Sequence, residues 1–145
     1  MSQSTTAPAS IGAVPLNAAG TSAALPFVGR TLIAAIYLLS GTSKIAAPAM
    51  TIGYIQSVGL PLPTFGFIIA LLVEIGGGVA LVLGYRTRLV AAIMALFTIA
   101  TALAFHNNLA DQNQFIHFFK NVAMAGGLLQ IVAFGAGRFS LDARR

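Results

Sequence analysis

The chain contains no cysteine. The protein therefore cannot carry out thiol–disulfide exchange itself, and it cannot hold a thiolate-ligated metal or an iron–sulfur cluster. Any redox role has to use a bound cofactor or a partner protein.

Charged residues are also scarce, at 8% of the 145 residues, whereas soluble domains carry about 25%. Hydrophobic residues make up 57% of the chain, and the mean hydropathy is +0.88. This composition excludes an ordinary soluble domain and indicates an integral membrane protein, with a single domain in a lipid bilayer. The net charge of +5 does not indicate a nucleic-acid partner, because lysine and arginine stand singly at the edges of apolar runs.

Four apolar runs are long enough for helices that cross a bilayer, which needs about 20 residues. They cover residues 25–45, 64–85, 89–105 and 116–135. Between the first two runs, Pro48 can open a short helix that ends near Gly59 and is too polar to span the membrane. The pattern predicts an all-α fold, an antiparallel bundle of four transmembrane helices with a short interfacial helix between helices one and two.

The flanking segments are polar. Residues 1–24 are rich in Ser, Thr, Ala, Gly and Pro, which predicts a disordered tail, and they lack the pattern of a secretory signal. We expect a membrane domain over residues 25–137 and a basic tail over residues 138–145.

Basic residues predict the orientation. Six of them fall on the side that holds both termini, and only Lys44 and Lys120 fall on the other side, so the positive-inside rule predicts cytoplasmic termini. We expect Arg30 to lie near a helix end and to extend to the membrane surface. The six are Arg30, Arg86, Arg88, Arg138, Arg144 and Arg145.

Glu74 lies at the centre of the second apolar run. Helical spacing places it on one face with Ala70, Gly77, Gly78 and Leu81, where a neighbouring helix can approach closely. The carboxylate therefore points into protein. It is either a functional acid, which is the usual role of an intramembrane carboxyl, or a structural one that pairs with a lysine or stays protonated.

Other polar residues gather on the same side of the membrane, so we predict an outer cavity around Glu74. Its expected lining is Tyr37, Lys44, Glu74, His106, Lys120 and Asn121. The alternative for the two lysines is extension to the membrane surface. His106 and His117 could equally be ordinary interfacial histidines, and we predict no metal site.

Glycines in the helices indicate close packing, because a missing side chain lets two backbones approach. The run that includes Gly77 and Gly78 is such a packing device and not a phosphate loop, since no strand precedes it. We expect packing roles for Gly41, Gly77, Gly78, Gly126 and Gly127.

A series of short motifs follows this pattern along the chain. The sequence has GR at Gly29, SGxxK from Ser40, GLP from Gly59, ExxGG from Glu74, a GxxTR-like turn from Gly84, a histidine at 106, and KN at Lys120 followed by Gly126 and Gly127. In this order the motifs resemble the DoxX family of small four-helix membrane proteins. The resemblance implies a multi-pass bacterial inner-membrane protein, with relatives tied to quinone-linked sulfur oxidation and oxidative-stress assemblies, and more distant relatives that act as chaperones or receptors.

Two functions remain open. The first is a redox-associated membrane subunit, within an oxidoreductase complex, that binds a quinone-like or other small apolar ligand around Glu74; the chain would then be an accessory subunit more than an enzyme on its own. The second is a non-enzymatic membrane adaptor or chaperone that assembles with another membrane or exported protein.

The orientation is testable with alkaline phosphatase, which is active only outside the cytoplasm. Because both termini are expected inside, a fusion after Arg145 should be inactive and a fusion near Asn113 should be active. The reverse pattern would contradict the predicted topology.

Overall fold

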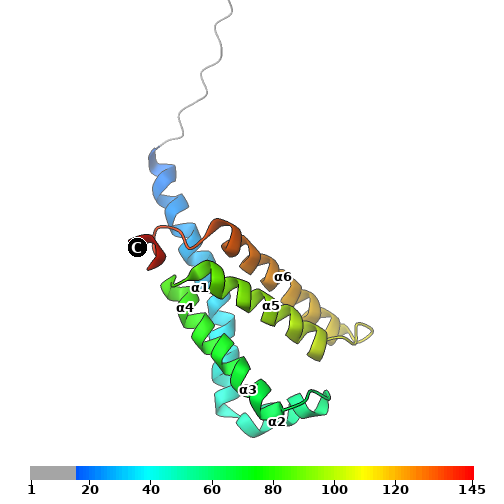
Figure 1. Ribbon diagram of the computed structural model, residues 1–145. Helices are drawn as coiled ribbons and strands as arrows, with labels where there is room; N and C mark the ends of the chain where they lie inside the picture. Colours follow the sequence, from blue (N-terminus) through cyan, green and yellow to red (C-terminus); the bar gives the residue numbers. More distant parts are fainter. Residues whose placement is uncertain (1–15) are drawn as a thin grey trace, which may run out of the picture.

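The computed structural model describes residues 16–145, and within this range it contains helices and no strand. Four segments are long and apolar enough to cross a membrane: Ala23–Ala46, Pro63–Leu83, Thr87–Phe105 and Gln112–Phe134. Their helices lie side by side in one bundle (Figure 1). The predicted all-α architecture with four membrane-spanning helices is confirmed.

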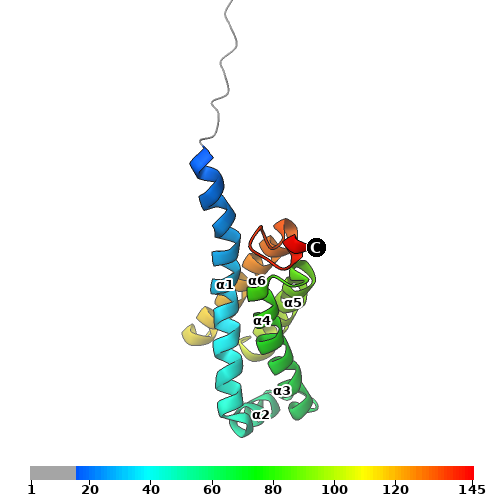
Figure 2. The same ribbon diagram turned by 90° about the vertical axis from the view of Figure 1, so that its left-hand side faces the viewer.

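The first spanning helix is α1 (Leu16–Ala46), and the short α2 (Pro48–Ser57) follows directly. The second has three consecutive parts, which are α3 (Pro63–Leu71), the π-helix η1 (Leu72–Gly77) and α4 (Gly78–Leu83). The third and fourth are α5 (Thr87–Phe105) and α6 (Gln112–Phe134), and a 3₁₀ turn, η2 (Asp142–Arg144), ends the chain. Figure 2 shows α1 as the longest element, running past the rest of the bundle.

The start of α1 differs from the prediction. A disordered tail was expected over residues 1–24, but residues 16–24 are helical, while residues 1–15 lie outside the described part. This segment contains four alanines, and alanine has the highest helix propensity of all residues. The alanines extend the helix beyond the apolar run.

Short side chains are frequent in the core, beside larger ones such as Met94 and Leu128. One face of α1 is buried at Arg30, Ala34, Tyr37 and Gly41. The corresponding face of α5 is buried at Ala91, Ala95, Thr98 and Ala102. Because the alanine, glycine and threonine residues on these faces are small, the helices can approach closely there. Such close packing is typical of membrane helices, which have no hydrophobic driving force for association within lipid.

Glycine allows the closest approach between α1 and the second spanning helix. A Cβ added at Gly41 would lie 2.5 Å from Cδ1 of Ile75, and one added at Gly78 would lie 2.8 Å from Cδ2 of Leu38. Gly126 differs from the expectation, because it is exposed and an added Cβ would meet nothing within 4 Å. Within this chain, Gly126 makes no close helix contact.

Arg30 does not extend to the membrane surface as predicted. It is 1% exposed, and its guanidinium donates to the carbonyls of Ala136 and Phe139 and, at 3.3 Å, to that of Val82. Its two Nη groups bind carbonyls that a helix end and a following loop leave free, while its buried Nε has no hydrogen-bond partner in the described part of the chain. Arg30 therefore holds the C-terminal segment against the bundle.

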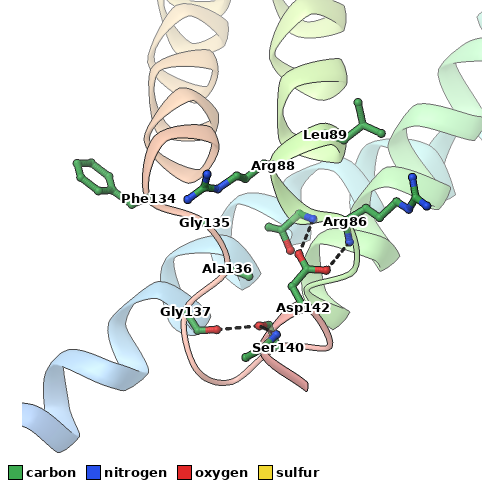
Figure 3. Close-up of a pocket in the computed structure, with 11 residues that line it drawn as sticks. Arg86, Arg88, Leu89, Phe134, Gly135, Ala136, Gly137, Ser140 and Asp142 are labelled. Atoms are coloured by element: carbon green, nitrogen blue, oxygen red, sulfur yellow. Dashed lines mark hydrogen bonds between the residues drawn. The ribbon is translucent and has the colours of Figure 1, made fainter. Parts of the chain in front are cut away.

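Asp142 completes this attachment. Its carboxylate accepts hydrogen bonds from the backbone N–H groups of Arg86 and Thr87, both at 2.8 Å, and so caps the start of α5 (Figure 3). The backbone N–H of Asp142 donates to Gly84 at 2.9 Å. Residues 138–145 are therefore packed on the turn between α4 and α5, whereas the sequence suggested a separate basic tail.

The attachment of this segment should depend on pH. The hydrogen bond from the Thr87 backbone lowers the pKa of Asp142, so the carboxylate stabilises the folded state above about pH 4, the ordinary aspartate range. This stabilisation is lost as the pH falls through the pKa of Asp142 in the folded protein, which is below the ordinary aspartate value. Hydrogen exchange of residues 138–145 should therefore be slow at neutral pH and accelerate in acid.

Removal of the carboxylate should have the same effect at neutral pH. Asp142→Ala should cost about 1 kcal/mol, a typical N-cap value, and should speed exchange in residues 138–145. Asp111→Ala is the matched control, since Asp111 caps α6 through the N–H of Gln114 and does not contact this segment. If residues 138–145 exchange hydrogen at the same rate in Asp142→Ala and in Asp111→Ala, Asp142 does not hold the segment.

Candidate functional site

A cavity of about 780 Å³ lies between α1, α2, α3, α5 and α6. This volume is within the range of about 300–1,000 Å³ that small-molecule pockets occupy. Apolar side chains form much of the wall, including Ile36, Ile69, Phe97 and Phe105. The cavity is also lined by all six residues that were expected together, which are Tyr37, Lys44, Glu74, His106, Lys120 and Asn121.

Glu74 reaches the cavity from η1, the π-helical part of the second spanning helix. A π-helix widens the turn and is found often at functional sites. Glu74 is 6% exposed, so its charge is largely removed from solvent. The sequence did not predict this wide turn, and the one available signal was the glycine run from Gly76 to Gly78, because glycine weakens the preference for a regular α-helix.

Lys44 neutralises Glu74. The Lys44 Nζ atom lies 2.9 Å from both carboxylate oxygens of Glu74 and also donates to Oγ of Ser40 at 2.7 Å. Lys44 stands in the last turn of α1, where the helix dipole also favours a cation. The side chain therefore turns inward instead of extending to the membrane surface, and among the possible lysine partners of Glu74 it is Lys44 that forms the pair.

Tyr37 belongs to a second, uncharged group in the cavity wall. Its hydroxyl forms a hydrogen bond with Oγ1 of Thr98, and the Thr98 hydroxyl donates to the carbonyl of Met94 at 2.6 Å. The Thr98 proton is thus used, so the Tyr37 hydroxyl is the donor between the two. The sequence did not predict Thr98 as a cavity residue, although it lines the cavity.

Two histidines form a polar group at the start of α6. The Nδ1 atom of His106 lies 2.8 Å from Oε1 of Gln114, and the ring of His106 stacks on that of His117 with centroids 5.1 Å apart. His117 Nδ1 in turn lies 3.1 Å from Nζ of Lys120. In the described part of the chain, no three residues of the metal-ligating types His, Cys, Asp and Glu lie together.

The helix α2 forms part of the cavity wall. Met50, Thr51 and Ile55 line the cavity, and the ring of Tyr54 stacks on Phe105 of α5 with centroids 5.4 Å apart. The sequence predicted this helix but not its contact with α5, which depends on a pair of aromatic residues far apart in the chain.

A second hollow, of about 590 Å³, lies at the opposite end of the bundle beside Arg86 and Arg88 (Figure 3). Its polar centre is already occupied, since Asp142 takes the backbone donors at the start of α5. Ser140 also donates to the carbonyl of Gly137 there, at 2.7 Å. The C-terminal segment forms one wall of this hollow, and the polar groups named here bind one another. The cavity around Glu74 is therefore the candidate site.

Comparisons with known proteins agree with this architecture. The family model described as DoxX matches residues 25–107. The inner membrane protein YqjF of Escherichia coli (strain K12) is 37% identical over 117 residues, which cover 79% of this chain and 87% of that protein. The inner membrane protein YphA of the same strain is 32% identical over 125 residues, covering 83% and 89%. No solved structure matches the chain.

The pair of Lys44 and Glu74 can be tested with a double-mutant cycle. Glu74→Leu should destabilise the protein by about 3 kcal/mol, because it leaves Lys44 unpaired in a setting of low dielectric constant. Adding Lys44→Met should restore most of the loss, since both charges are then gone. Thermal unfolding in detergent micelles compares the stability of the parent, the two single variants and the double variant. If the double variant loses as much stability as the two single variants together, Lys44 and Glu74 do not form a direct pair.

Proposed function

Because the chain belongs to the DoxX family and is a multi-pass inner-membrane protein, we propose that it is a redox-associated membrane subunit that binds a small apolar ligand. The ligand is quinone-like in size and polarity and occupies the cavity around Glu74. In this proposal the protein is an accessory subunit of an oxidoreductase complex, because a chain without cysteine supplies no electron carrier of its own.

One observation carries the proposal: an ion pair lies in the wall of a cavity that is otherwise largely apolar. The carboxylate of Glu74 lines the cavity and is held by Lys44 at 2.9 Å. An apolar pocket with a few convergent polar groups is the usual form of a small-molecule site. Charged groups are costly inside a bilayer, so a pair that faces a cavity instead of packed side chains favours a functional role.

The polar residues have distinct roles in this proposal. Glu74 is the proton-carrying acid, which can exchange a proton with the ligand through the cavity. His106, Lys120 and Asn121 hold the polar groups of the ligand near the start of α6. Tyr37 offers its hydroxyl on the wall shared with Thr98.

The proposed orientation places this cavity on the non-cytoplasmic half of the membrane and both termini in the cytoplasm. The end that carries Arg86, Arg88, Arg138, Arg144 and Arg145 is then cytoplasmic, as the positive-inside rule requires. The membrane domain covers residues 25–137 in this proposal, and α2 lies at the outer surface of the bilayer.

Glu74→Gln tests the role of the acid. Glutamine keeps the shape and an acceptor oxygen for Lys44 but carries no ionisable proton. Because glutamine leaves the Lys44 ammonium without a counter-charge, the variant should unfold at a lower temperature than the parent. When its level in the membrane is matched to that of the parent, it should still fail to restore the phenotype of a deletion strain. Asp111→Asn, which changes an acid outside the cavity, is the control and should restore it; full function of Glu74→Gln would contradict proton transfer.

The ligand itself is tested by binding. Decylubiquinone should bind the purified protein in nanodiscs, and a lipid-soluble ligand should copurify from native membranes. If neither is observed with ligand in excess, the ligand-binding part of the proposal is wrong.

A second function, a membrane adaptor or chaperone, is favoured by one observation. Gly126 on α6 is exposed and open, which leaves a place where a helix of another protein can approach closely. Crosslinking in intact membranes separates the two functions. A stoichiometric protein partner joined at the Gly126 face supports the adaptor, whereas contacts between copies of this chain alone support a ligand-binding bundle.

A further inference from the structure

Lys120 is the cation of the cavity that has no acidic partner anywhere in the chain. The sequence contains three acidic residues, and all of them lie in the described part. Glu74 pairs with Lys44, while Asp111 and Asp142 cap the starts of α6 and α5. The ion pair cancels its own charge, so the polar part of the cavity carries the net positive charge of Lys120.

This cation lies within the apolar part of α6. Lys120 is four residues after Ile116, where the apolar run of the helix begins, which corresponds to about 6 Å along its axis. Exposed apolar side chains flank it on both sides along the chain: Phe115, Ile116, Phe119 and Val122. Lys120 is itself exposed, and it lines the cavity, where its Nζ atom lies beside His117. A charge in the apolar part of a spanning helix is costly unless it finds a partner there.

The groups next to Lys120 are hydrogen-bond donors. A lysine ammonium has only hydrogens to offer, so Nδ1 of His117, at 3.1 Å, must accept. The proton of the neutral His117 ring is then on Nε2. The amide of Asn121, which also lines the cavity, adds further N–H groups. This set matches a ligand group that has only acceptors and a negative charge.

We propose that the ligand of this cavity carries one anionic oxygen group, a carboxylate or an ionised ring hydroxyl, on an apolar body. The anionic group binds Lys120, His117 and Asn121, and the apolar body lies along Phe97, Phe105 and Met124. This inference rests on the proposed function, because it takes the cavity to be a ligand site, and it adds the chemical class of the ligand.

The test compares dodecanoate with dodecanol, which have the same chain length and differ in charge. The full-length protein is placed in nanodiscs of phosphatidylcholine, which has no net charge, at a mildly alkaline pH where the carboxylate is ionised. Binding is measured by equilibrium dialysis, with empty nanodiscs as the background. The parent should bind dodecanoate at least roughly tenfold more tightly than dodecanol, which corresponds to about 1.4 kcal/mol.

Two variants assign this preference to Lys120. Lys120→Gln should still bind dodecanol but should lose the preference for dodecanoate. Arg138→Gln makes the same change in net charge at an exposed position at the other end of the bundle, and it should keep the preference.

The remaining outcomes separate the two proposals. The anionic ligand class is wrong if dodecanol or decylubiquinone binds but the parent shows no preference for dodecanoate. It is also wrong if Lys120→Gln keeps the preference. In both cases the cavity remains a ligand site. If none of the three molecules binds the parent, both the inference and the proposed function are wrong.

Discussion

The ion pair of Lys44 and Glu74 is the interaction on which the rest of the bundle depends. A carboxylate in the middle of a membrane helix is tolerated only if the protein neutralises it, and the C-terminal turn of α1 supplies the cation at 2.9 Å. The pair requires α1 and η1 to lie close together, which glycine at position 41 allows beside Ile75. The wide turn of η1 and the close approach of α1 therefore serve the same contact.

A buried arginine makes the equivalent connection at the opposite end. Arg30 binds the carbonyls of Ala136, Phe139 and Val82, and thus joins α1 to α4 and to the C-terminal segment. Between these two polar contacts the helices pack through a core in which alanines lie beside larger side chains such as Leu81, Met94 and Leu128. The Glu74 end of the bundle holds the candidate cavity, where α2 reaches α5 through Tyr54 and Phe105.

Sequence periodicity predicted the features that depend on local spacing. The four spans could be found from the apolar runs, and the inward face of Glu74 could be found because a helix places residues three or four apart on one face. The six cavity residues could be grouped because the predicted topology places them on the same side of the membrane. Helical spacing could not predict the direction that a long side chain takes. Arg30 was expected to extend outward, and Lys44 was expected either in the cavity or at the membrane surface, because their partners are far away in the chain, 106 residues for Ala136 and 30 for Glu74. The packed C-terminal segment and the π-helix were missed because both are set by tertiary contacts.

The most direct test of this account is the ionisation state of Glu74 in the membrane. Infrared difference spectroscopy between the parent and Glu74→Gln, with ¹³C-labelled glutamate, isolates the bands of this one side chain, because Glu74 is the single glutamate of the sequence. A carboxylate held by Lys44 should give the paired symmetric and antisymmetric carboxylate bands and no protonated carbonyl band at neutral pH, and Lys44→Met should convert it to the protonated form. A protonated carboxyl band in the parent would contradict the ion pair as the organising contact.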